Sequence, residues 1–239
     1  MGTHGQILNN SFPSHAVITL VGVAHVIDVR RQIESIIISQ DPDVVAVELD
    51  YGRYYAMTHR VEGDMPYIYR KMAEMQKNLA RMFGTEVGSE MLVAINVART
   101  LGKQVALIDM DSMEIVKRIK KNMGVIEKLR LYTSFLLAPF SRKRIGKEDI
   151  KEIVENEEKY VGYLRKKFPG LSRALFEDRE EYMAKKLLDI EKNGHVMAFV
   201  GDAHIAGLKK LLPDAKIIRL RDIITEGETW EISYTISFN

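Results

Sequence analysis

The chain contains no cysteine among its 239 residues. Disulfide bonds, thiolate metal ligands and a cysteine nucleophile are therefore excluded. Long apolar runs are missing too, since no stretch approaches the roughly 20 residues that a membrane-spanning helix needs. The N-terminus also lacks the basic-then-apolar pattern of a signal peptide. We therefore expect a cytoplasmic protein, or the soluble domain of a membrane-associated protein whose anchoring segment is not part of this chain.

A strong charge of either sign is also lacking. The 35 Lys and Arg residues nearly balance 33 Asp and Glu residues, which leaves a net charge of +2. Because proteins that bind nucleic acid concentrate positive charge on one face, the composition predicts no nucleic-acid partner. Neither the glycine-rich phosphate loops nor the Gly-x-Ser-x-Gly nucleophile elbow is found in the sequence, and nucleotide-binding and serine-hydrolase functions gain no support.

The segments that are present predict an α/β fold. Short apolar, β-branched runs are typical of strands that are buried on both faces. We expect such strands at Ala16–Ala24, Val44–Leu49, Val105–Asp109, Met197–Val200 and Lys216–Leu220. Apolar residues at helical spacing predict helices between the strands, at Val26–Ser39, about Arg53–Phe83, Gly88–Leu101 and Ala206–Leu212. Asp41-Pro42 should stop the first of these helices, and Gly102 should cap the helix that ends at Leu101. The alternation of strand, helix and strand predicts a mostly parallel central sheet flanked by helices.

The organisation of the chain is predicted to be simple. We expect one α/β domain over residues 1–239, in which residues 1–14 form a disordered lead-in. The pattern over residues 112–192 is almost wholly helical and predicts a long helical insertion between the third and fourth strands. This insertion suits a lid or the arm of a homodimer, and it suits equally a layer that packs on the sheet. The tail Thr229–Phe238 alternates like an edge strand.

One motif occurs at the ends of two predicted strands. Val21–His25 and Val200–His204 both read Val-Gly-x-Ala-His, and each is followed by a β-branched residue. Glycine at such a point lets the backbone turn sharply or approach a ligand. Since ligands of open parallel sheets bind beyond the carboxyl ends of the strands, we expect His25 and His204 to converge on one cleft.

Several acidic residues also follow predicted strands. Glu48 lies within an otherwise apolar strand, where a carboxylate is costly unless it is paired or binds a ligand, so a functional role is favoured. Asp109 and Asp111 follow the third strand and can equally well cap the next helix. A lone histidine after a strand usually caps a helix or forms a hydrogen bond, whereas two in matched contexts favour function. The remaining histidines are not expected to belong to a site: His4, His15, His59 and His195.

The ordered set of motifs resembles the TraB/GumN/Tiki family. That family has a Gly-x-x-His motif, then Val-Glu-Leu-Asp and an arginine, then an acidic-Arg-acidic stretch ending in Met-Ala, and a second Gly-x-x-His. The matching positions are Gly22–His25, Glu48–Asp50, Arg53, Glu177–Ala184 and Gly201–His204, within a resemblance that covers about Val17 to Leu220. It implies a fold shared with erythromycin-esterase-like and haem-binding ChaN-like proteins.

The resemblance also implies a function. Tiki members look like metalloproteases that clip signalling peptides, and TraB members are linked to shutting down peptide pheromones. Carried over position by position, the site would comprise His25, Glu48, Arg53, Arg179 and His204. The expected activity is that of a metal-dependent peptidase that acts on small or signalling peptides. Members of this family are often preceded or followed by membrane segments, which this chain lacks.

Three mechanisms remain open. In the first, His25 and His204 bind a divalent ion such as Mn, Co or Zn, and Glu48 is a third ligand or the general base. Arg179 would then stabilise a developing oxyanion or a substrate carboxylate. In the second, a histidine oriented by a carboxylate activates water without a metal. In the third, the protein binds a peptide or haem without catalysis, with haem ligands limited to His, Tyr and Met.

Overall fold

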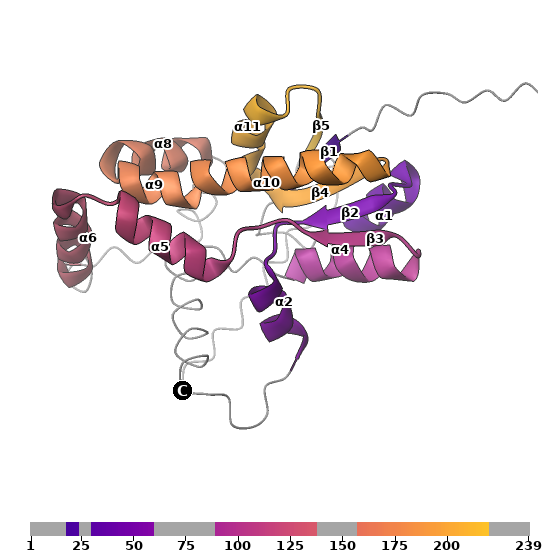
Figure 1. The fold of residues 1–239 in the computed structure, drawn as a ribbon, viewed down its shortest axis with the longest axis horizontal. Coiled ribbons are helices and arrows are strands. Elements are labelled where there is room, and N and C mark those ends of the chain that lie inside the picture. Colours follow the sequence, from indigo (N-terminus) through magenta and orange to yellow (C-terminus); the bar gives the residue numbers. More distant parts are fainter. Residues whose placement is uncertain (1–17, 24–29, 60–88, 138–156, 220–239) are drawn as a thin grey trace, which may run out of the picture.

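The computed structural model describes residues 18–23, 30–59, 89–137 and 157–219. Within these ranges five strands form one sheet in the order β3-β2-β4-β1-β5. Every pairing in it is parallel. The strands are β1 (Ile18–Val23), β2 (Val44–Val47), β3 (Gln104–Leu107), β4 (Val196–Gly201) and β5 (Lys216–Arg219). The predicted α/β class with its parallel sheet is confirmed (Figure 1).

Helices cover both faces of the sheet. On one face, Ile33 of α1 (Arg30–Gln40) and Ile95 of α4 (Ser89–Thr100) share a core with Phe199 of β4. On the other face, Leu187 of α10 (Glu177–Ile190) and Leu208 of α11 (Asp202–Leu211) share a second core with apolar residues of β1, β2 and β4. The central strands β1 and β4 are buried along their whole length, whereas the edge strands are partly exposed. Continuous apolar runs therefore mark the middle of the sheet.

Two helix ends follow the rules that the sequence suggests. Helix α1 ends at Gln40, next to the predicted Asp41-Pro42 stop, and Asp41 takes a positive φ of 43°. After α4, Gly102 has a φ of 69°, and its N–H donates to the carbonyl of Arg99. The N–H of Lys103 donates to the carbonyl of Ala98, which completes a Schellman motif. The predicted role of Gly102 as the cap of this helix is confirmed.

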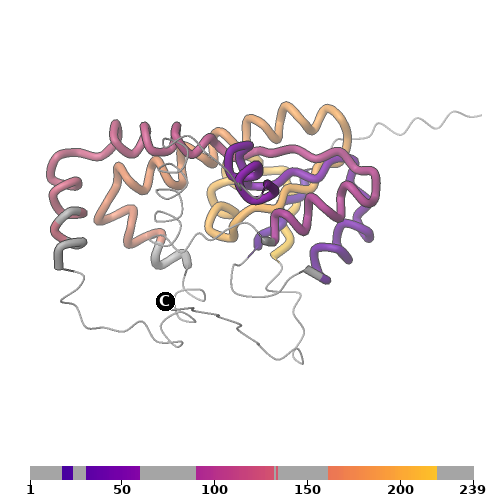
Figure 2. The backbone as a smooth tube through the Cα atoms, turned by 90° about the horizontal axis from the view of Figure 1, so that it is seen from below, coloured from indigo at the N-terminus to yellow at the C-terminus, as the bar shows by residue number. Residues whose placement is uncertain are grey.

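The helical insertion is divided between two places. Helices α5 (Ser112–Asn122), α6 (Val125–Leu137), α8 (Glu157–Lys167) and α9 (Pro169–Leu175) lie together beyond one end of the sheet. They share a small core of their own around Met123, Phe168 and Leu171. Helix α10 returns from them and runs along the sheet (Figure 2). Of the arrangements that the sequence left open, packing on the sheet therefore describes α10 alone.

Some predictions fall outside the described residues. These are the lead-in at residues 1–14, the first motif's His25, the helix expected beyond α2 (Tyr51–Thr58), and the strand at residues 229–238. Over the ranges that the structure describes, no helix combines the length and the apolar character needed to cross a membrane.

Candidate active site at the carboxyl end of the sheet

The connections of the chain change from one face of the sheet to the other beside β4. The chain leaves β1 and β2 for α1 and α4 on one face of the sheet. It leaves β3 and β4 for α10 and α11 on the opposite face. Since β4 lies between β2 and β1, neighbouring strands send the chain to opposite faces at their carboxyl ends. In open α/β sheets this is the place where ligands bind.

The strand residues of the two motif copies lie side by side at this point. Their strands β1 and β4 are neighbours, and Gly22 pairs with Val200 while Val23 pairs with Gly201. The two glycines are therefore one residue out of register. A Cβ atom at Gly22 would overlap Oδ1 of Asp202, so the first motif's glycine makes room for the second motif's carboxylate.

The position of the second motif's histidine differs from the prediction. Helix α11 begins at Asp202, so His204 lies in the first turn of a helix rather than at a strand end. Gly201 is the N-cap and is extended, which turns the chain directly from β4 into α11. His25 lies outside the described residues, so its convergence with His204 stays a prediction.

A buried arginine joins two carboxylates from neighbouring strands. Arg179, in the first turn of α10, donates from Nε to Asp109 Oδ1 at 3.0 Å and from Nη2 to Asp109 Oδ2 at 2.7 Å. The same Nη2 donates to Glu48 Oε1. All three side chains are buried. Such a fork suits guanidinium geometry, and it offsets the cost of burying two negative charges.

Glu48 is held by backbone groups as well. Its Oε2 accepts the N–H of Gly201 at 2.7 Å, and its own N–H donates to the carbonyl of Phe199. β2 ends at Val47, so Glu48 is the first residue after the strand. The sequence-based prediction, which placed Glu48 inside the strand, is wrong in this respect. The carboxylate of Glu48 therefore lies at the carboxyl end of the sheet, while the backbone of Glu48 still bonds to β4.

The electrostatics of the cluster favour charged carboxylates. Burial alone would raise the pKa of Glu48, but the charges of His204 and Arg179 outweigh burial and hold that pKa below 4.5. Burial likewise opposes ionisation of Asp109, yet Arg179 and Arg53 hold its pKa well below the usual range. For Arg179, burial is outweighed by Asp109 and Glu48, and its pKa is raised. Ionised acids and a permanent cation therefore stabilise one another in the site.

His204 lies between two glutamates. Its Nδ1 is 3.2 Å from Glu180 Oε1, and its Nε2 is 3.4 Å from Glu48 Oε1. The ring is buried, and its centroid is 5.6 Å from that of Phe176. Glu180 fits beside the ring because Gly207 of α11 has no side chain. A Cβ atom at Gly207 would overlap the carboxylate of Glu180. Two carboxylates therefore fix both edges of the imidazole.

Arg53 connects the edge of the site to its centre. Its Nε donates to Asp50 Oδ2 at 2.5 Å, and its Nη2 donates to Asp109 Oδ2. Asp50 is the N-cap of α2, where it accepts the N–H of Arg53 at 3.0 Å, and it also accepts the hydroxyl of Ser112. The Arg53 side chain keeps about a fifth of its surface exposed, 22%. It is therefore the cation of the cluster that solvent reaches most readily.

Sequence reasoning left two members of the cluster without an assigned role. Asp109 was balanced between capping and function; it joins the site, whereas Asp111 caps α5 by accepting the N–H groups of Met113 and Glu114. Glu180 belongs to the acidic-Arg-acidic stretch but was not singled out. The signal for both was weak, since each depends on which way a side chain turns once α10 and α11 pack together.

A metal ion needs several donor atoms that converge on one point. Among the residues that the structure describes, no group of three or more His, Asp and Glu side chains is arranged to hold one. His204 and Glu48 supply an imidazole nitrogen and a carboxylate oxygen, which are two of the three ligands that the sequence suggested. Zn, Mn and Co accept these atom types, and Glu48 Oε1 also accepts from Arg179 Nη2, so the described residues supply two candidate ligands and no complete metal site.

The fold and the site together define an α/β protein with one buried cluster of acids, arginines and histidine at the carboxyl end of its sheet. The sequence profile of the TraB/PrgY/gumN family matches residues 10–216, and the chain belongs to this family. It is also 30% identical over 210 residues to an uncharacterized protein of Methanocaldococcus jannaschii. That match covers 82% of this chain and 53% of the relative, so the chain spans about half the length of the curated relative.

Proposed function

We propose that this protein is a metal-dependent hydrolase that cleaves peptides, with its site at His204, Glu48 and Arg179. The observation that carries the proposal is the placement of His204, with Glu180 on Nδ1 and Glu48 facing Nε2. Histidines that bind metals commonly donate their other ring N–H to a carboxylate, which fixes the ring and makes the ligand more basic. Glu180 takes that position here.

The distance between the two donor atoms supports the same proposal. His204 Nε2 and Glu48 Oε1 are 3.4 Å apart, which is long for a hydrogen bond. Two ligands with bonds of about 2.0–2.1 Å to one tetrahedral ion lie about 3.4 Å apart. Such an ion, when bound, would polarise a scissile carbonyl and make its bound water more acidic. His25 is the candidate for a further ligand, on the strength of the family motif alone.

The chain's own groups suit the remaining tasks of hydrolysis. If Glu48 does not bind the ion, its ionised carboxylate can instead act as the general base that accepts a proton from water. Arg179 keeps Glu48 and Asp109 charged, and its Nη1 donates to the carbonyl of Leu175. Arg53 is partly exposed and suits the binding of a substrate carboxylate or carbonyl. The choice of peptides as substrate rests on the family resemblance.

A second candidate is hydrolysis without a metal. The hydrogen bond between His204 Nδ1 and Glu180 orients the ring as in a carboxylate–histidine general base. In that case Nε2 would activate water directly. This candidate predicts activity that survives chelation, whereas the metal-dependent hydrolase loses activity and regains it with Mn, Co or Zn.

The experiment is a peptide-library digestion followed by mass spectrometry. The protein would be stripped with chelator and assayed alone and with each of the three metals. We expect metal-dependent cleavage that is abolished in His204→Gln. It should be retained in Glu181→Gln, which alters the exposed residue that follows Glu180 on α10. Cleavage that persists in chelator would favour the second candidate. Stoichiometric binding of peptide or hemin without any product would favour a non-catalytic binding protein and contradict both.

A further inference from the structure

The net charge of +2 is the sum of two regions with net charges of opposite sign. Residues 112–176, from the start of α5 to the end of α9, contain 16 Lys and Arg but only 8 Asp and Glu, a net charge of +8. The rest of the chain contains 19 basic and 25 acidic residues, a net charge of −6. In the part of this region that the structure describes, residues 112–137 and 157–176, 11 Lys and Arg face 4 Asp and Glu. The helices that project beyond the sheet are therefore strongly cationic (Figures 1 and 2).

At the far end of this region, α6 exposes apolar side chains. Val125, Ile126 and Leu129 have exposed fractions of 82%, 76% and 62%. They are spaced i, i+1 and i+4, so they share one face of the helix, which we call the α6 patch. Three aliphatic side chains this exposed on adjacent turns are unusual on a surface that only contacts water.

The inward side of α6 explains why the apolar side faces outward. Glu127 is buried, and its Oε1 accepts the N–H of Leu171 at 2.9 Å. Leu171 lies in the first turn of α9, so Glu127 caps that helix. A Cβ atom at Gly170 would overlap the carbonyl of Asn122, which shows how closely α9 approaches the end of α5. The orientation of α6 is thus fixed by a polar contact with α9, and the α6 patch is held away from the protein.

Basic helix ends lie on both sides of the α6 patch. Lys128 donates from Nζ to the carbonyl of Lys120, at the end of α5. Arg130 donates from Nη1 to the carbonyl of Lys167, at the end of α8. The last turns of these two helices carry Lys120, Lys121, Arg165, Lys166 and Lys167, all exposed to solvent. The apolar stripe is therefore bordered by positive charge on either side.

We propose that the α6 patch docks on the surface of an anionic membrane, with the helix lying in the plane of the interface. Aliphatic side chains flanked by lysines and arginines are the arrangement by which interfacial helices bind acidic lipids. Nucleic acid would use the charges but not Val125, Ile126 and Leu129, which offer it neither stacking nor hydrogen bonds. Two copies that met through their α6 patches would bring two +8 regions together, which repel each other. An anionic lipid surface satisfies both the apolar and the charged observations.

The test is sedimentation of the full chain with vesicles of phosphatidylcholine, with or without phosphatidylglycerol. We expect binding to the anionic vesicles only. The variant Ile126→Asp/Leu129→Asp should bind about tenfold or more weakly, because it removes apolar area from the interface. Lys120→Glu/Lys121→Glu should also bind about tenfold more weakly, with a loss of salt sensitivity. The matched control is Ile38→Asp, an exposed position of α1 on the body (56% exposed), which should bind normally.

Three results would overturn this proposal. They are no binding to either kind of vesicle, binding that Ile126→Asp/Leu129→Asp leaves unchanged, and a concentration-dependent dimer that this variant dissociates. Binding to nucleic acid at the expense of vesicles, unchanged by the same variant, would point to a charged partner without an apolar component and would also count against it. Circular dichroism of each variant checks the fold. Because the α6 patch is separate from the site at His204, the digestion assay should be unaffected by these changes.

Discussion

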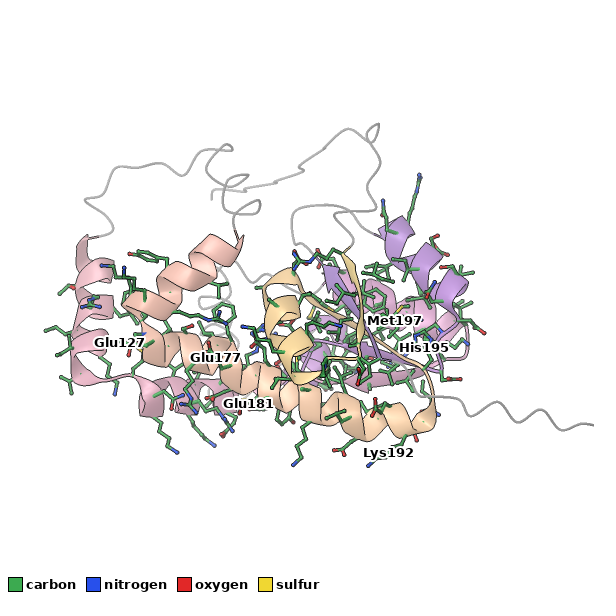
Figure 3. All side chains as sticks on the ribbon, turned by 90° about the horizontal axis from the view of Figure 1, so that it is seen from above. Glu127, Glu177, Glu181, Lys192, His195 and Met197 are labelled. Carbon is green, nitrogen blue, oxygen red and sulfur yellow. The ribbon has the colours of Figure 1, made fainter. Side chains whose placement is uncertain are left out.

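The two ends of β4 carry similar residues but use them differently. His195 immediately precedes the strand, and His204 follows it. At the amino end, the His195 N–H donates to Asp43 Oδ2, its carbonyl accepts from two backbone N–H groups, and its ring pairs with Thr19 Oγ1 at 3.0 Å. Figure 3 labels His195 beside Met197 at this end of the strand. These contacts complete the turn that leads into the sheet.

At the carboxyl end, charged side chains bond to one another instead. His204 faces two glutamates, and Arg179 joins Glu48 to Asp109 in a buried cluster. One cation of the amino end, Lys103, pairs with Asp41, whose side chain is 79% exposed. The comparison shows that residue type does not distinguish a site from a structural turn. The distinction comes from burial and from charges that share partners, which the carboxyl ends of parallel strands bring together.

The largest expected difference between the two ends is in stability. Arg179→Met would leave Glu48 and Asp109 buried without their counter-ion, so we expect it to lower the free energy of unfolding by about 3–5 kcal/mol. Lys103→Met removes a cation from a solvent-exposed pair at the other end and should cost less than about 1 kcal/mol. Urea denaturation of both variants measures the two values. Equal losses would contradict the comparison.

The next effect concerns metal affinity. Glu180→Gln keeps the size of the side chain but weakens its hold on His204 Nδ1, and we expect divalent-metal affinity to fall about 10–100-fold. The matching change at the other end, Asp43→Asn, alters the acceptor for the His195 N–H and should leave metal affinity as it is. Calorimetric titration with Zn, Mn and Co compares them. A normal affinity in Glu180→Gln would remove its positioning role.

The smallest effect is a difference in the pH dependence of stability. Glu48 and Asp109 have lowered pKa values in the folded protein. Their contribution to the free energy of unfolding is therefore complete above their ordinary pKa values of 4.5 and 3.8, and it is lost as the pH falls further. At the amino end, burial and the charge of Lys216 lower the pKa of His195, which favours its neutral form. The contribution of His195 to the free energy of unfolding is complete above pH 6.5, and it is lost as the pH falls through its lower pKa in the folded protein.

Urea midpoints measured from neutral to acid pH should therefore show two regions of loss. Because the ring of His195 is only partly buried, the loss that begins near pH 6.5 should be slight, and His195→Gln should remove it. The steeper loss below about pH 4.5 should remain in that variant. A single acid transition that His195→Gln abolishes would contradict the assignment of the two ends.

Much of the fold could be predicted because its signals are local. The apolar runs marked all five described strands, and Gly102 marked the end of α4, because burial and backbone conformation restrict those positions directly. Helix α11 began four residues before its predicted start at Ala206, since its first turn carries the polar residues of the motif and shows no apolar periodicity. The position of α6 could not be predicted, because it depends on Glu127 reaching α9.

The site was predictable only in part, for a related reason. Glu48 was conspicuous as an acid in an apolar run, and the two motifs pointed to His204. The family resemblance, and not spacing, implied that Arg179 and Glu48 belong to one site, since 131 residues separate them. Asp109 and Glu180 became members through the packing of α10 against the sheet and against α11. Long-range packing of this kind leaves no periodic trace in a sequence.

The most direct test of the site is a metal titration of the native chain beside His204→Ala and His195→Ala. The two variants remove the same side chain from opposite ends of β4. Our account predicts one divalent ion bound per chain in the native protein and in His195→Ala, and no measurable binding in His204→Ala. Equal binding in all three proteins, or no binding in any of them, would contradict a metal site at the carboxyl end of the sheet.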